Sequence, residues 1–295
     1  MTAFIKKILL CLLGLSGALC AWASLEIMLF WGDSAGGYFL LSLIEGIIIG
    51  LFFGFVFGSA DGILLSDKRR ALEGGLSGLC IGALAGAAVT VLVQGLLTAL
   101  FNMELFSRKT EASLVLPLIR AAGWCILGAA IGSIDGLRSR SPRRAGIGIS
   151  GGALGGLLGG LLLELAGRFL SNGFAARGIG ILVMGTCIGL FYSIFEAQRS
   201  FGILKVLTGT IRGKEYLLAS AKTILGSSRR SAMDLRGYKG IEDEHLLLRA
   251  EKNGVLAESL RGKVTINEKP AEKKTLRYED VIELGSLKLL FLPVR

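Results

Sequence analysis

Long runs of apolar residues fill the first two hundred positions of the chain, and short charged segments separate them. Six of these runs are long enough to cross about 30 Å of hydrocarbon as helices. They cover residues 8–31, 38–60, 72–101, 114–134, 146–169 and 178–197. The first run follows two lysines, so it is either an uncleaved span or a secretory signal ending near Ala21-Trp22-Ala23. We expect an uncleaved span, because apolar residues continue to Trp31.

Glycine recurs at every fourth position in several of these runs. The ladders are Gly46 to Gly58, Gly74 to Gly86 and Gly148 to Gly160. An interior glycine costs a soluble helix about 1 kcal/mol relative to alanine. In lipid the helix is nearly obligatory, and a stripe of glycines lets neighbouring backbones approach closely. The ladders therefore predict a tightly packed bundle of membrane helices over residues 1–200.

Two of the apolar runs end in the same pattern. Gly-Ser-Ala-Asp-Gly at 58–62 and Gly-Ser-Ile-Asp-Gly at 132–136 lie 74 residues apart, and an Arg-Arg-Ala follows each at that same offset. The sixth run ends in a weaker echo, Ser-Ile-Phe-Glu at 193–196. We interpret the bundle as three glycine-rich hairpins related by an internal repeat, of which the fifth and sixth runs form the third. Asp61 and Asp135 are expected to be turn residues beside glycine.

The basic residues cluster at the amino end and in the loops after the second and fourth runs. The positive-inside rule places these segments in the cytoplasm, so we expect a multi-pass protein of the inner (plasma) membrane with both termini inside. This placement explains much of the net charge of +10, and it favours membrane lipid over nucleic acid as a partner. All five cysteines lie in apolar runs without metal-ligand spacing, so no disulfide, metal or cofactor is expected.

Several polar residues interrupt the apolar runs at a similar depth, toward the outer side. This predicted intramembrane polar layer consists of Glu26, Glu45, Gln94, Arg120 and Glu164. An ionisable side chain in hydrocarbon is costly and usually paired, so we expect Arg120 to pair with Glu45 or Glu164. Two interpretations remain open: a salt bridge that fixes helix rotation, which we favour, and an ion or proton site. No run carries a polar stripe through its full depth, as a permeation pathway would require.

The composition changes abruptly after Arg199. Short apolar segments alternate with glycines and charged turns, which predicts an antiparallel β-sandwich over residues 201–295. The expected strands cover residues 204–208, 215–218, 222–225, 245–249, 264–266, 281–284 and 288–292.

The order of motifs in this tail resembles the forkhead-associated (FHA) domain family. An opening hairpin at 206–216, Gly-Ser-Ser at 226–228, Glu-Asp-Glu-His at 242–245 and a closing segment at 276–285 follow the family's order. The resemblance implies a module that binds phosphothreonine peptides through loops at one end of the sandwich. The partner-binding residues that it implies are Ser227, Ser228, Arg229, Arg230, Glu242, His245, Arg261 and Asn267.

Two of these positions differ from the family's pattern. Ser227 and Glu242 stand where the family has its phosphate-binding arginine and serine. A carboxylate repels phosphate, so we expect a degenerate site. Arg229 and Arg230 either replace the lost donor or face anionic lipid headgroups. His245 matches a scaffold position and has no nucleophile partner, so a structural role is expected.

The sequence carries no sign of an enzyme, because the glycines do not form a phosphate loop and no catalytic triad is present. We expect a membrane-anchored interaction or scaffold protein of a signalling type. It would present the FHA-like module to a cytoplasmic protein or peptide without ordinary phosphothreonine recognition. The alternative is a transporter or channel regulated by its cytoplasmic domain, since internal repeats and intramembrane charges occur in many transporters.

Overall fold

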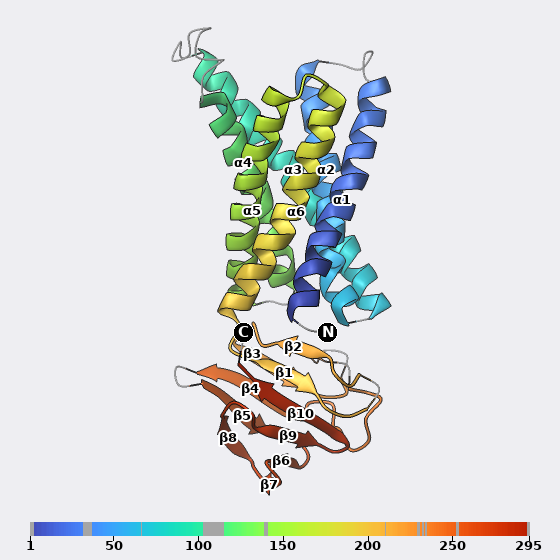
Figure 1. Ribbon diagram of the computed structural model, residues 1–295, viewed down its shortest axis with the longest axis vertical. Helices are drawn as coiled ribbons and strands as arrows, with labels where there is room; N and C mark the ends of the chain where they lie inside the picture. Colours follow the sequence, from blue (N-terminus) through green and yellow to red (C-terminus); the bar gives the residue numbers. More distant parts are fainter. Residues whose placement is uncertain are drawn as a thin grey trace. The chain divides into compact units, whose positions relative to one another are not determined.

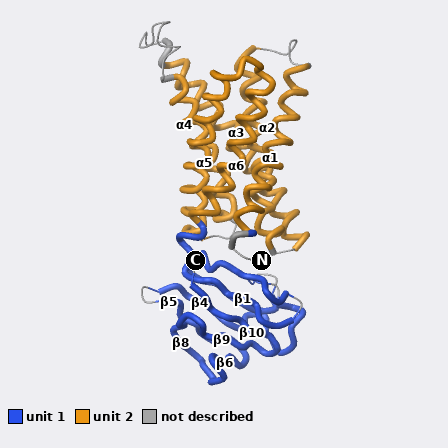
Figure 2. Tube along the Cα trace, in the orientation of Figure 1, with its two compact units in different colours: residues 1–5, 196–295 blue, residues 6–195 orange. Residues whose placement is uncertain are grey.

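The structure, a computed structural model, contains long helices in its amino-terminal part and short strands in its carboxy-terminal part (Figure 1). It describes residues 3–31, 37–65, 67–102, 115–138, 141–209, 211–228, 231, 233, 235–251 and 254–293. The chain forms two compact units, one of residues 6–195 and the other of residues 1–5 and 196–295 (Figure 2).

Six helices in the described residues are long and apolar enough to cross a membrane, as the hydrophobic runs predict. They are α1 (Ala3–Trp31), α2 (Tyr38–Leu65), α3 (Lys68–Asn102), α4 (Val115–Arg138), α5 (Pro142–Phe169) and α6 (Gly173–Arg199). Many large apolar side chains on their outer faces are exposed, for example Leu84 at 73% and Phe169 at 82%. Such a surface is stable in lipid, where apolar side chains need no partner from the protein.

Asp61 and Asp135 lie inside helices rather than in turns, which corrects the expectation from the sequence. Each is followed by a glycine that the next helix approaches closely. A Cβ on Gly62 would collide with the backbone of Ala71, and a Cβ on Gly136 with the backbone of Ala145. The absent side chain therefore serves close helix contact, and the helix continues past the glycine.

The turns themselves are closed by two capping residues, Asp67 before α3 and Ser141 before α5. The Asp67 carboxylate accepts from the backbone N–H of Arg70 at 3.1 Å, and the Ser141 hydroxyl accepts from that of Arg144 at 3.3 Å. Both side chains satisfy backbone donors that lack partners at the start of a helix. Asp67 and Ser141 are also 74 residues apart, so the offset seen in the glycine motifs extends to the caps.

The glycine ladders lie where helix backbones meet. A Cβ at Gly54 of α2 would collide with the carbonyl oxygen of Gly78 in α3, and one at Gly128 of α4 with that of Gly152 in α5. Each of these contacts leaves no room for even one methyl group. These helix pairs therefore gain dispersion contacts between their backbones along the glycine stripes, which is a main source of helix association in lipid.

A second glycine stripe on α5 faces α6, as expected for a hairpin of these two helices. Its members Gly151, Gly155 and Gly159 contact the backbone of Tyr192, Ile188 and Met184. The helices α1 and α6 also meet through glycine, since a Cβ at Gly14 would collide with the backbone of Gly185. Close packing thus joins the two ends of the helical unit as well as neighbours in sequence.

The second unit contains two antiparallel sheets, which confirms the predicted sandwich. One sheet has the order β2-β1-β10-β9-β6-β7 and the other β3-β4-β5-β8. The strands are β1 (Ile203–Val206), β2 (Glu215–Leu217), β3 (Lys222–Leu225), β4 (Leu246–Glu251), β5 (Gly254–Ser259), β6 (Val264–Ile266), β7 (Lys269–Pro270), β8 (Lys273–Leu276), β9 (Val281–Leu284) and β10 (Leu287–Leu292). Alternate residues of both sheets, such as Leu204, Leu248 and Ile282, fill a common apolar core.

Three of these strands were not predicted. The segment of β5 has a short continuous apolar run rather than an alternating pattern, and β7 is only two residues long. Strand β8 has three polar residues out of four and lies at the edge of its sheet. Polar edge strands are common because they discourage pairing with other chains, and for the same reason they are hard to recognise in a sequence.

Candidate functional site

Four connections of the sandwich meet at one end, which we call the loop end. They join β1 to β2, β3 to β4, β5 to β6 and β9 to β10. The Tyr238 hydroxyl donates to the carbonyl of Thr208 at 2.9 Å, and the Lys239 N–H donates to the Ser286 hydroxyl at 3.1 Å. These bonds hold the long connection between β3 and β4 against its neighbours.

His245 is a central support of the loop end. It is 1% exposed, and both of its ring nitrogens are used within the domain. Nδ1 accepts from the backbone N–H of Glu242 at 3.0 Å, and Nε2 lies 3.1 Å from the carbonyl oxygen of Lys263. Since Nδ1 accepts, Nε2 carries the proton and donates. The ring therefore ties two loops together, an arrangement that fits the structural role expected for it.

Gly262 makes this arrangement possible. Its φ is +83°, and a Cβ at this position would press against the His245 ring. A side chain would be disfavoured by the backbone angle as well as by the ring.

The residues at the phosphate-binding positions are joined to an acidic segment. The backbone N–H of Ser227 donates to the carbonyl of Glu242 at 2.9 Å, so the structure brings these two positions together. The Ser227 hydroxyl donates to the Asp243 carboxylate at 2.9 Å. Glu242, Asp243 and Glu244 are all exposed. A phosphate dianion would meet three neighbouring carboxylates here, and like charges repel even at an exposed site, although water weakens the repulsion.

The other expected partner-binding residues are distributed differently. Arg261 is exposed at the loop end. Its backbone N–H donates a hydrogen bond of 3.4 Å to the backbone carbonyl of His245. Ser228 is half-buried, and its backbone N–H donates a hydrogen bond of 3.1 Å to the backbone carbonyl of Asp243. Arg229 and Arg230 lie outside the described residues.

Asn267 lies at the opposite end of β6, away from His245 and Lys263. Its amide donates to the Asp280 carboxylate at 2.6 Å and accepts from the backbone N–H of Val281 at 2.8 Å. Burial would by itself raise the pKa of Asp280, but hydrogen bonds from the Arg277 backbone, Asn267 and Lys274 outweigh it and lower the pKa. These contacts fix the backbone at the start of β9.

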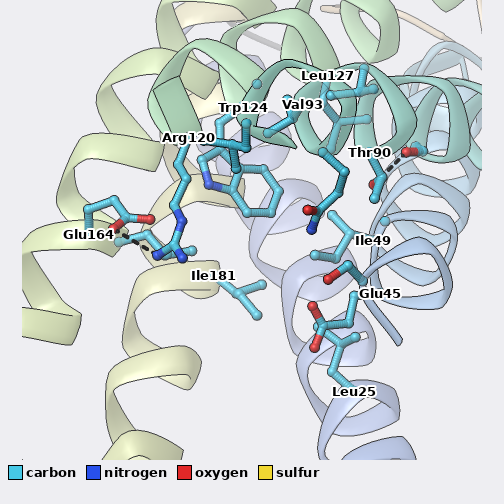
Figure 3. A pocket seen from close by; sticks show the side chains of 18 of the residues that line it. Leu25, Glu45, Ile49, Thr90, Val93, Arg120, Trp124, Leu127, Glu164 and Ile181 are labelled. Atoms are coloured by element: carbon cyan, nitrogen blue, oxygen red, sulfur yellow. Dashed lines mark hydrogen bonds and ion pairs between the residues drawn. The ribbon is translucent and has the colours of Figure 1, made fainter. Parts of the chain in front are cut away.

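The helical unit holds a second candidate site, a cavity of about 660 Å³ lined by residues of all six helices. Figure 3 shows part of this lining. Four of the polar residues expected in the membrane lie around it: Glu45, Gln94, Arg120 and Glu164. Arg120 Nη1 lies 3.5 Å from Glu164 Oε2, so Arg120 pairs with Glu164, one of its two expected alternative partners.

The fifth polar residue, Glu26, pairs with Arg177, which also lines the cavity. The Arg177 guanidinium donates two hydrogen bonds of 2.8 Å to the Glu26 carboxylate, and Trp22 adds a third of 3.2 Å. Arg177 was not predicted to belong to this polar layer. The structure places it within α6, one turn after the helix begins, so that it reaches α1.

A further charged cluster, absent from the sequence-based predictions, joins the repeated aspartates. Arg144 Nη1 lies 3.5 Å from Asp61 and 3.4 Å from Asp135, and so connects α2, α4 and α5. The internal repeat could have indicated this cluster, because Arg144 follows Asp135 at the same spacing at which Arg70 follows Asp61. No group of three metal-ligating side chains is found among the described residues.

Residues 205–295 match a family model described as "Inner membrane component of T3SS, cytoplasmic domain". The match covers less than half of the chain. No curated protein matches the chain.

Three solved structures illustrate what the tail resembles. An FHA domain studied for phosphothreonine-dependent interactions is 25% identical, with coverage of 31% of this chain and 94% of its own, at a TM-score of 0.29. The FHA domain of CT664 from Chlamydia trachomatis is 26% identical. The match covers 32% of this chain and 98% of that domain, at a TM-score of 0.30. The cytoplasmic domain of the T3SS sorting platform protein PscD from P. aeruginosa is 20% identical. The match covers 32% of this chain and 86% of that domain, at a TM-score of 0.26. The TM-scores are low, so the family match and the observed sandwich carry the FHA-like assignment.

Proposed function

We propose that the chain is a membrane-anchored interaction protein whose FHA-like domain docks a cytoplasmic protein through the loop end. The support comes from six membrane-length helices joined to a domain of a family of inner-membrane components. Domains of this kind are interaction modules rather than enzymes. The membrane unit would keep the module, and whatever it binds, at the inner face of the membrane.

Docking at the loop end does not use ordinary phosphothreonine recognition in this proposal. The observation that carries it is the exposed acidic segment from Glu242 to Glu244. In addition, the Ser227 hydroxyl already donates its hydrogen bond to the Asp243 carboxylate. Phosphate sites supply charge-assisted donors, usually from arginine, and Ser227 and Glu242 replace them here. A partner surface with basic and polar groups would suit these carboxylates better than a phosphate.

The orientation follows from charge in the same proposal. The basic turns between α2 and α3 and between α4 and α5 lie on the cytoplasmic side, and the even number of spans then places both termini there. This agrees with the family description, which calls the matching domain cytoplasmic.

Site-specific crosslinking in living cells tests the docking surface. A photoreactive amino acid replaces Glu244 or Arg261 at the loop end, and Thr275 on the edge strand β8 serves as the control. We expect the loop-end positions to crosslink one cytoplasmic protein that the β8 position does not. Crosslinks from β8 alone, or the same products from all three positions, would contradict the proposal.

The second candidate function is transport or conduction, which the charged cavity among the helices favours. Uptake or conductance by the purified chain in liposomes, abolished by Arg120→Gln, would support it. Transport and docking are separable, because the loop-end residues and the cavity belong to different units.

A further inference from the structure

The cavity in the helical unit is lined mainly by apolar side chains. Leu25, Ile49, Val93, Leu127 and Ile181 line it from five different helices (Figure 3). Its volume of about 660 Å³ lies within the range of small-molecule sites, roughly 300–1,000 Å³. An apolar space of this size in a membrane bundle accommodates an acyl or aryl group.

The charges at this cavity do not balance. Arg120 pairs with Glu164, and Arg177 with Glu26. Glu45 is the remaining carboxylate, and it makes no hydrogen bond or ion pair with any residue in the described part of the chain. Arg177 acts on it only electrostatically, and that guanidinium already makes two hydrogen bonds to Glu26.

The polar groups near Glu45 are suited to accept hydrogen bonds. Thr90 lies beside Gly46, the residue after Glu45. Its hydroxyl donates its proton to the carbonyl of Gly86 at 2.9 Å, so its lone pairs remain for another donor. The amide oxygen of Gln94, one helical turn further along α3, adds another acceptor at the cavity.

We propose that this cavity binds an amphiphile carrying a protonated amine, with the ammonium at Glu45 and the hydrocarbon chain along the apolar wall. A carboxylate in hydrocarbon is costly unless it is paired, and an ammonium ion supplies both the charge and three donors. Trp124 contributes an aromatic wall, which also favours cations. Such an ammonium group occurs both on phospholipid headgroups and on free lipophilic amines.

Binding of chemically matched probes tests the charge preference. The full chain is purified in a neutral detergent, and decylamine and decanoate are compared by native mass spectrometry. We expect one decylamine per chain and at least tenfold weaker binding of decanoate. Equal binding of the two, or a preference for decanoate, would overturn the proposal without any variant.

Variants locate the site. Glu45→Gln should weaken decylamine binding at least tenfold, whereas Glu45→Asp should retain it. Glu73→Gln is the matched control, because Glu73 is exposed and pairs with Arg69 outside the cavity. Undiminished binding by folded Glu45→Gln, or an equal loss in Glu73→Gln, would contradict the assignment.

Nanodiscs distinguish the two sources of the ammonium group. If the natural ligand is a lipid, chains taken from phosphatidylethanolamine nanodiscs should retain that lipid in a Glu45-dependent manner, and decylamine should compete with it. If the ligand is a free amine, decylamine should bind without displacing lipid. Both outcomes support an ammonium site, and independence from Glu45 in both arms would refute it.

Discussion

Positions 227 and 242 are the two places where the loop end departs from the FHA pattern. The backbones of Ser227 and Glu242 are hydrogen-bonded to each other, so the loops retain their connection although the phosphate donors are missing. Substituting two side chains can therefore change recognition while leaving that backbone bond in place.

We predict that Ser227→Arg combined with Glu242→Ser gives the domain measurable phosphothreonine binding. The arginine supplies a charge-assisted donor and the serine removes a repelling carboxylate, which together are worth a few kcal/mol in a partly desolvated site. Isothermal titration with a phosphothreonine peptide library measures this. Micromolar binding by the unaltered chain would show that our account of these two positions is wrong.

Asp280 shows how a buried carboxylate makes the sandwich sensitive to acid. Its pKa is lower in the folded domain than the ordinary value of about 3.9. The resulting stabilisation is fully present above that value and is lost as pH falls through the lower folded pKa.

We therefore predict that Asp280→Asn lowers the stability of the sandwich at pH 7 and makes stability less dependent on pH below about 4. Denaturant unfolding of residues 196–295 between pH 7 and pH 2 measures both effects. Thr223→Val, a change at a half-buried position on β3 that has no hydrogen bond to a carboxylate among the described residues, serves as a control with an unchanged acid dependence. A parallel shift of the Asp280→Asn curve at all pH values would contradict the explanation.

At the scale of elements, the helices depend on glycine at particular positions rather than on glycine in general. Gly82 of α3 faces the backbone of α2, where a Cβ would collide with the Gly50 carbonyl. Gly95 of the same helix is exposed, and a Cβ there would have nothing within 4 Å.

We predict that Gly82→Val destabilises the bundle by about 1–3 kcal/mol or more, because the opposing backbone cannot move aside easily. Gly95→Val should leave stability unchanged. Thermal unfolding of the two variants in the same detergent, followed by size-exclusion chromatography, compares them. Equal unfolding temperatures would mean that the glycine contacts do not hold α2 against α3.

The sequence predicted the elements better than their connections. Hydrophobic length alone identified all the described helices, because lipid leaves the backbone little alternative. It did not identify Asp67 and Ser141 as caps, since the neighbouring Asp-Gly pairs carry a stronger turn signal. Arg177 was not assigned to the polar layer for a related reason: whether an arginine near a helix end faces water or a carboxylate depends on its tertiary partner, here Glu26.

The strands and the loop-end site show the same limit. Alternating strands such as β9 were recognised, whereas the polar edge strand β8 was not. The resemblance grouped Asn267 with the loop-end residues, but its contacts are with Asp280 and Val281. The order of the motifs shows in which order the loops follow along the chain. The end of the sandwich at which each loop lies depends on the direction of the strands that it joins.

At the scale of the whole molecule, the chain consists of two compact units with different structures. The helical unit provides membrane-length spans and a charged cavity, and the sandwich provides an end with exposed loops. The central claim is that this loop end holds a cytoplasmic protein without reading a phosphate.

Quantitative co-purification with the full chain, with and without phosphatase treatment of the cell extract, tests this claim most directly. Glu242→Arg alters the loop end, and Lys273→Glu on β8 is the matched charge-reversal control. We predict that the same protein is retained before and after phosphatase, is lost with Glu242→Arg and is kept with Lys273→Glu. Loss of that protein on phosphatase treatment, or its retention by Glu242→Arg, would contradict the account.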